Sequence, residues 1–170
     1  PNVPQFLSWV AAKTSKIKLG TTVTVLPWAN PVRVAESFLL LDHLSEGRAI
    51  LGMGRGLGKG EFDGFKVPMG ESRARFRENA EAVLQALETG VMEYDGTYLK
   101  QPRVELRPRP YASYRGRVFA SAVSPESVKL MANLDVGLMI IAQKPWDRVA
   151  EDVKSYRDRF LAMQGRPAPK

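Results

Sequence analysis

Three segments of the sequence carry residue types that bind a phosphate or another small anion. Arg55 follows a glycine-rich stretch, and Arg73 stands at the start of a later amphipathic segment. Ser124 precedes Pro125, where it can cap a helix, and Ser127 lies three residues on. A helix N-terminus offers free backbone N–H groups, and an arginine can bind an anion through two parallel hydrogen bonds. Each signal alone is also typical of a surface arginine or an ordinary cap, but together they predict an anion site.

The glycine-rich stretch does not fit a nucleotide fingerprint. Glycines occupy the first, third and fifth positions of Gly52–Leu57, whereas the dinucleotide motif needs one at the sixth. No Walker loop is present either. We therefore interpret the stretch as the end of a strand and a loop that presents Arg55, because ligand sites in parallel α/β folds lie at that end of the strands.

The composition argues against several other chemistries. The chain has no Cys and a single histidine, His43, and its carboxylates lack ligand spacing, so we expect no metal and no cysteine nucleophile. His43 falls inside a predicted helix, where a structural role is expected. The absence of Cys also fits a cytoplasmic protein.

The charge pattern gives no sign of nucleic acid or membrane binding. The 25 Lys and Arg residues exceed the 18 Asp and Glu residues by 7, but the cations are interspersed with acids and form no compact run. No apolar stretch approaches the about 20 residues that a membrane-spanning helix needs. We therefore expect neither partner.

Strands and helices must alternate to position the anion-binding residues. Apolar patterns predict strands at residues 17–25, 49–54, 118–122 and 136–142. Helices are predicted to follow them, from Pro31, over residues 72–89, from Pro125 and from Pro145. Residues 91–107 predict a β-hairpin insertion with Asp95-Gly96 as its turn.

Four strand–helix units predict an α/β fold with a parallel sheet and helical crossovers. An open doubly wound sheet and a (β/α)8 barrel both have this order, and four units make half of such a barrel. No linker divides the sequence, so we expect residues 1–170 to form a single domain from which the hairpin protrudes.

These segments together resemble the luciferase-like flavin-dependent monooxygenases, the family of bacterial luciferase. The similarity is carried by residues 17–21, 25–27, 30–31, 35–36, 41–48, 51–57 and 72–74, and it continues more loosely to about residue 142. The resemblance implies a (β/α)8 TIM-type barrel, of which about four βα units are present. It also implies that reduced FMN binds at the carboxyl ends of the strands and that O2 is used to oxidise an organic substrate.

The resemblance implies roles for individual residues as well. Arg55, Arg73, Ser124 and Ser127 match positions that hold the flavin phosphate, in agreement with the anion site predicted above. The family's catalytic histidine belongs to a strand expected before residue 1, so no catalytic residue is identified in the chain.

Other positions match the surroundings of the flavin ring. Thr22 and Val23 fall on an unusual non-proline cis peptide that supports the ring, and Gly54 falls where the luciferase α chain has a cysteine near the reactive flavin carbon. Leu57 belongs to the same cofactor-binding stretch. Val123 replaces an acidic residue beside the phosphate serine.

The resemblance leaves alternative functions open. A deazaflavin-dependent dehydrogenase or reductase on the same fold would transfer hydride and consume no O2, and a non-catalytic half-barrel would bind flavin without turnover. For a monooxygenase, the resemblance implies a separate flavin reductase and a homodimer. Two barrel strands at each end are expected to be missing from the 170 residues, so we expect this piece alone to be inactive.

Overall fold

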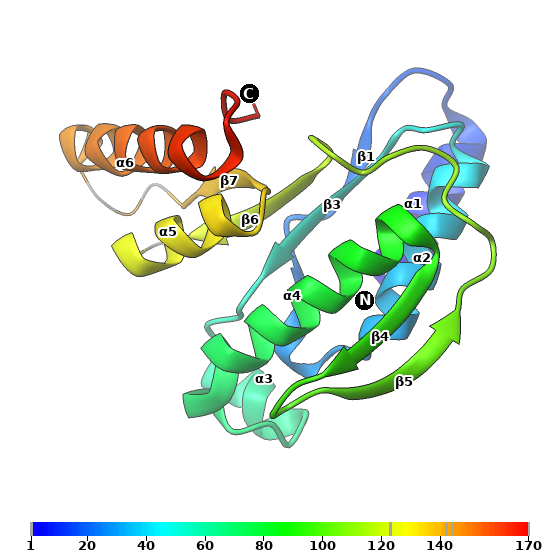
Figure 1. The fold of residues 1–170 in the computed structure, drawn as a ribbon. Helices are drawn as coiled ribbons and strands as arrows, with labels where there is room; N and C mark the ends of the chain where they lie inside the picture. The colour runs from blue at the N-terminus through cyan, green and yellow to red at the C-terminus, as the bar shows by residue number, and fades with distance from the viewer. Residues whose placement is uncertain (1, 123, 142, 144, 170) are drawn as a thin grey trace.

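The computed structural model describes residues 2–122, 124–141, 143 and 145–169. It has an α/β fold on a parallel sheet with the strand order β1-β3-β6-β7, and β2 also pairs with β3 (Figure 1). The elements in chain order are α1 (Val3–Lys13), β1 (Leu19–Gly20), β2 (Thr24–Val25), η1 (Leu26–Trp28), α2 (Pro31–Leu44), β3 (Ala49–Gly54), α3 (Lys59–Gly64), η2 (Met69–Glu71), α4 (Ser72–Thr89), β4 (Val91–Asp95), β5 (Lys100–Glu105), β6 (Val118–Ala122), α5 (Pro125–Asn133), β7 (Gly137–Ile140) and α6 (Trp146–Gln164).

The alternation of strands and helices predicted from the sequence is confirmed. Strands β3 and β6 and helix α4 have the predicted bounds. Asn30 caps α2 by accepting a hydrogen bond from the Arg33 N–H at 3.1 Å, and Ser124 caps α5 by accepting one from the Ser127 N–H at 3.3 Å. Helix α1, which precedes the first strand, has no counterpart in the sequence prediction.

Two groups of helices pack beside the sheet. Helix α2 packs against both α1 and α4, whereas α5 and α6 pack against each other beside β6 and β7 (Figure 1). Their apolar stripes, such as Phe38 of α2 and Val83 of α4, join Leu51 of β3 in one buried core. Helices α1 and α2 therefore pack against β1 and β3, and helix α5 packs against β6 and β7.

The first predicted strand, residues 17–25, is wrong in its middle. β1 ends opposite Ile50 and β2 begins opposite Met53, so the three residues 21–23 stand opposite only the two residues 51–52. The peptide bond between residues 22 and 23 in this bulge is cis. The Thr21 hydroxyl, 2.7 Å from the Gly52 carbonyl and 3.1 Å from its N–H, replaces the backbone pairing there. The last predicted strand is also shorter than expected, because β7 covers only Gly137–Ile140.

The predicted hairpin forms, but its turn is not the two-residue Asp95-Gly96 turn. β5 begins at Lys100, and residues 96–99 form a loop around a buried carboxylate, that of Glu78 on α4. This carboxylate accepts hydrogen bonds from the N–H groups of residues 97, 98 and 99 at 3.0, 2.7 and 2.8 Å. The local Asp-Gly preference is overridden because these three donors find a charged acceptor on the helix beneath them.

The Glu78 carboxylate should make the stability of the fold depend on pH. Burial alone would raise its pKa, but the three N–H donors and Arg77 outweigh burial and hold the pKa below the ordinary value of 4.5. Since the pKa is lower in the folded chain, the stabilisation is present above pH 4.5 and is lost as the pH falls through the folded-state pKa. We expect Glu78→Gln to lose about 1–3 kcal/mol of unfolding free energy at pH 7, and less at pH 4.

Denaturant unfolding at the two pH values tests this expectation. Glu93→Gln is the matched control, because Glu93 is exposed on β4 and its neutralisation removes no buried acceptor. A Glu78→Gln loss that is the same at pH 4 and pH 7 would contradict the assigned role of the charge.

Candidate functional site

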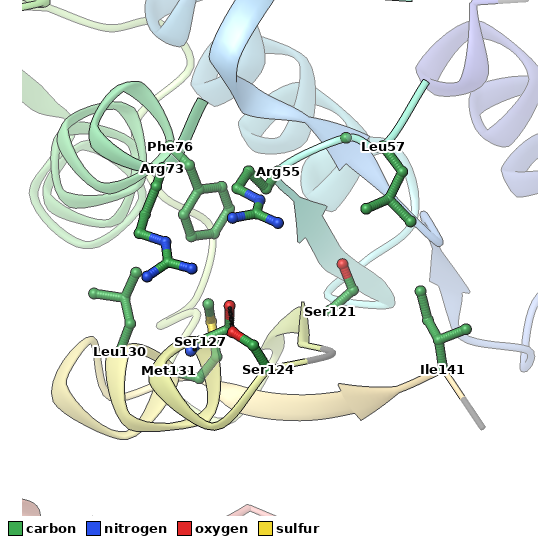
Figure 2. A pocket seen from close by; sticks show the side chains of 11 residues that line it. Arg55, Leu57, Arg73, Phe76, Ser121, Ser124, Ser127, Leu130, Met131 and Ile141 are labelled. Atoms are coloured by element: carbon green, nitrogen blue, oxygen red, sulfur yellow. Dashed lines mark hydrogen bonds between the residues drawn. The ribbon is translucent and has the colours of Figure 1, made fainter. Parts of the chain in front are cut away.

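A cavity of about 200 Å3 opens where β3 and β6 end, between the start of α4 and the start of α5 (Figure 2). Five residues predicted from the sequence line it: Arg55, Leu57, Arg73, Ser124 and Ser127. They come from segments up to about 70 residues apart, and the parallel sheet brings them together because the carboxyl ends of its strands meet at one edge.

The two arginines bring positive charge to the cavity without an ion-pair partner among the described residues. Arg55 lies on the loop after β3, and Arg73 lies in the first turn of α4; Figure 2 shows both guanidinium groups directed into the same space. Within the described residues, neither forms a hydrogen bond or an ion pair. Arg75 of the same helix differs, since it pairs with Glu71 at 2.8 Å and lies over the Tyr98 ring.

The N-terminus of α5 forms the opposite wall. The Ser124 and Ser127 hydroxyl oxygens lie 3.0 Å apart at the first turn of this nine-residue helix. The exposed carboxylate of Glu126 responds to the same field: its own backbone N–H and the Ser124 hydroxyl lower its pKa, with smaller contributions from Arg73 and Lys129. The N-terminus of α5 therefore favours a negatively charged group.

Beside the cavity, residue 23 and strands β3 and β6 pack closely together at Gly54. Gly54 ends β3, and a Cβ there would stand 2.4 Å from the Val23 Cγ2 and 2.9 Å from the Ser121 Oγ. No side chain fits at position 54, because the Val23 and Ser121 side chains already occupy the space that a Cβ would need. Thr22, Val23 and Gly54 do not line the cavity, but Val23 and Gly54 border it at this point.

Sequence reasoning missed part of the lining. Ser121, Leu130, Met131 and Ile141 also face the cavity, and Phe76, predicted as a core residue, is both buried and part of its wall. No sequence signal identifies Ser121, because only the structure shows which face of β6 borders the cavity. Val123, predicted to contact the cofactor, lies outside the described residues.

Aromatic side chains hold the loop that carries Arg55. The Trp28 ring stacks on Phe65 at 5.2 Å and meets Phe62 edge-on at 4.7 Å. Gly56 passes so close to Trp28 that a Cβ would stand 2.9 Å from its ring, and its φ of +80° suits glycine. The Trp28 cluster thus fixes the path of the chain next to Arg55.

His43 lies away from the cavity, on α2. Its Nε2 is 2.8 Å from the Arg109 carbonyl oxygen, and its ring meets Tyr111 edge-on at 5.2 Å, which agrees with the predicted structural role. In the described part of the chain, no cluster of three or more His, Asp or Glu residues could hold a metal ion. Nor does any described helix combine the length and apolar character needed to cross a membrane.

Comparisons with known proteins agree with this fold. The model of the family described as luciferase-like monooxygenase matches residues 1–170. The chain is 32% identical over 152 residues to the alkanal monooxygenase beta chain of Photorhabdus luminescens, covering 89% of the chain and 46% of that relative.

Two solved structures show the same fold. The monooxygenase RslO1 from Streptomyces bottropensis superposes with a TM-score of 0.91 at 29% identity, over 99% of this chain and 52% of that one. The coenzyme F420-dependent tetrahydromethanopterin reductase from Methanopyrus kandleri superposes with a TM-score of 0.80 at 27% identity, over 98% and 51%.

The chain spans about half the length of these proteins, as expected for part of a TIM-type barrel. The match to the family model extends over all 170 residues. The chain belongs to the luciferase-like monooxygenase family.

Proposed function

We propose that the native protein binds FMN with the phosphate in the cavity between α4 and α5, and uses reduced flavin and O2 to oxidise an organic substrate. The observation that carries the proposal is the pair of unpartnered guanidinium groups, Arg55 and Arg73, facing the N-terminus of α5 across one cavity. A dianionic phosphate would neutralise both cations and accept hydrogen bonds from the helix end.

The residues present fit the rest of the cofactor. Leu57 and Ile141 offer apolar surface that would keep water from the ring. When bound, reduced flavin supplies the electrons for O2 activation, so the protein needs only to bind and orient the reactants.

Arg73→Ala tests the phosphate site. We expect the native-length protein to bind FMN more tightly than riboflavin, which lacks the phosphate. The variant should lose FMN affinity by about tenfold or more, because a charge-assisted hydrogen bond is removed, while riboflavin affinity stays unchanged. Titration followed by flavin fluorescence measures both constants.

Arg75→Ala is the matched control for this titration. It removes the same charge from the same helix, but Arg75 pairs with Glu71 instead of facing the cavity. Equal affinity of the native protein for FMN and riboflavin would contradict the phosphate site.

A deazaflavin-dependent dehydrogenase or reductase is the second candidate function. The similarity to the F420-dependent reductase, at 27% identity and a TM-score of 0.80, favours it. The two reactions differ in their use of oxygen: a monooxygenase consumes O2 during turnover with reduced FMN, whereas a hydride-transferring enzyme consumes none. An oxygen electrode with the native-length protein therefore separates them.

We also propose a domain organisation and protein partners for the native protein. Residues 1–170 form one part of the barrel domain, with the hairpin of β4 and β5 as an insertion, and the native protein forms a homodimer supplied by a separate flavin reductase. The exposed apolar side chains of Leu40 and Leu44 on α2, each about half exposed, support a protein contact at this helix.

A further inference from the structure

A second cavity adjoins the one that is proposed to hold the flavin phosphate. It measures about 450 Å3 and lies between α4, the start of α5 and the short helix η2. The two cavities share Arg73, Ser127 and Leu130, whereas Arg77 and Glu126 line only the second. A ligand bound in the first cavity can therefore continue past Arg73 into the second.

Arg77 is an exposed cation in the wall of this second cavity. Within the described residues it forms no hydrogen bond or ion pair, although its charge helps to lower the pKa of the buried Glu78. Arg75, on the same helix, instead pairs with Glu71 at 2.8 Å. Arg77 is therefore a guanidinium that α4 leaves available to a ligand.

Arg77 follows Arg73 by one turn of α4. Four residues of an α-helix rise about 6 Å and return to the same face, so the two side chains are neighbours. The proposed flavin phosphate is neutralised by Arg55 and Arg73, which leaves Arg77 for a further negative group. A second phosphate, joined to the first through one oxygen, lies within reach of such a long side chain and suits its paired N–H donors.

One carboxylate in the second cavity, that of Glu126, opposes an anion there. Its backbone N–H and Ser124 lower its pKa, so it stays charged at neutral pH. Glu126 is exposed, however, and within the described residues no ion pair joins it to Arg77. Water screens an exposed charge, and the two guanidinium groups outnumber it. The lining therefore keeps an excess of positive charge.

We propose that the second cavity binds a second phosphate joined to the flavin phosphate, so that the protein takes a flavin diphosphate such as FAD as well as FMN. The inference rests on the proposed function, since it places the first phosphate between Arg55, Arg73 and α5. Arg77 is then the residue that selects for the second phosphate. The adenosine beyond it extends toward solvent, because Arg77 and Glu126 are exposed there.

Titration calorimetry of the native-length protein with FMN and FAD tests the proposal. We expect FAD to bind at least as tightly as FMN. Arg77→Ala should weaken FAD binding by about tenfold, because a charge-assisted contact with the second phosphate is lost, and should change FMN binding by less than about threefold. Arg75→Ala is the matched control and should change neither affinity, since Arg75 pairs with Glu71.

Inorganic pyrophosphate separates the second phosphate from the adenosine half of FAD. In the native-length protein it should displace FMN at a concentration about tenfold below that of inorganic phosphate, and Arg77→Ala should remove most of this advantage. The FMN affinity also separates a ligand contact from a structural effect through Glu78. A variant with a damaged α4 would lose FMN as well, because Arg73 lies on the same helix.

The outcomes distinguish this inference from the proposed function. Failure of the native protein to bind either cofactor would overturn both. A native protein that prefers FMN to riboflavin but binds FAD more weakly than FMN would overturn the inference alone. Equal changes of the FMN and FAD affinities in Arg77→Ala, or displacement of FMN by pyrophosphate and phosphate at the same concentration, would also overturn it.

Discussion

Asp42→Ala is expected to cost about 3–5 kcal/mol of unfolding free energy, because it strips the partner from a largely buried guanidinium. The fully buried Asp42 carboxylate meets Arg117 through two hydrogen bonds of 2.6 and 2.9 Å and also accepts the Ala49 N–H at 3.2 Å. Arg117 lies 4.2 Å above the Tyr114 ring. Burial opposes its charge, but Asp42 outweighs burial and keeps the pKa of Arg117 above its ordinary value.

Glu36→Ala is the control for this prediction. Glu36 lies on the same helix and pairs with Arg33 at 2.8 Å, but the Arg33 side chain is 81% exposed. Such surface pairs contribute about 1 kcal/mol or less. Denaturant unfolding at pH 7 measures both losses, and an Asp42→Ala loss no larger than that of Glu36→Ala would contradict the role of the buried pair. The double variant Asp42→Leu/Arg117→Met should recover much of the loss, since no buried charge is then unpaired.

The Asp42–Arg117 pair also marks a limit of prediction from the sequence. Residues 41–48 are part of the segment that most specifically resembles the family, yet the resemblance assigns no role to Asp42 or Arg48. The structure gives both a structural role: Arg48 donates to the carbonyl oxygens of Ala11, Thr14, Ile17 and Ser45. Asp42 and Arg117 are 75 residues apart, and three of the four Arg48 acceptors lie 31 to 37 residues away, so no local pattern reveals these pairings.

Elements with a strong local signal were predicted well. β3, β6 and α4 combine an apolar pattern with a clear start or stop, such as Gly90 in the left-handed conformation after α4. Elements whose conformation depends on a residue distant in the chain were not predicted well. In the hairpin, hydrogen bonds from residues 97–99 to Glu78 replaced the expected Asp95-Gly96 turn. In the segment 17–25, hydrogen bonds between the Thr21 hydroxyl and Gly52 interrupted the expected strand.

The candidate site shows the same division. Arg55, Arg73, Ser124 and Ser127 were identified because each follows a recognisable strand end or helix start, and the fold brings all four to one cavity. Ser121 has no such signal, since a serine in an alternating strand faces the cavity only if that side of the sheet does. Its place in the cavity wall became visible only with the structure.

The bulge at residues 21–23 leads to the second large prediction, that Gly52→Ala disrupts the fold and the packing beside the cavity together. A Cβ on Gly52 would stand 1.8 Å from the Thr21 carbonyl oxygen and 2.9 Å from its carbon. These are backbone atoms and cannot turn away, so residues 21–23 must shift or separate from β3. We expect a loss of about 3 kcal/mol or more of unfolding free energy, at the upper end for overpacking.

Gly60→Ala is the matched control for Gly52→Ala. Gly60 lies in α3 with nothing within 4 Å of its Cβ position, so alanine there should be neutral or stabilise the helix by up to about 1 kcal/mol. Denaturant midpoints of the two variants in the native-length protein provide the comparison. Riboflavin binding should also be weakened in whatever fraction of Gly52→Ala folds, because Val23, which packs on Gly54 beside the cavity, moves with residues 21–23. A Gly52→Ala protein that unfolds at the same midpoint as Gly60→Ala and binds riboflavin normally would show that the close approach of Thr21 to β3 is not required.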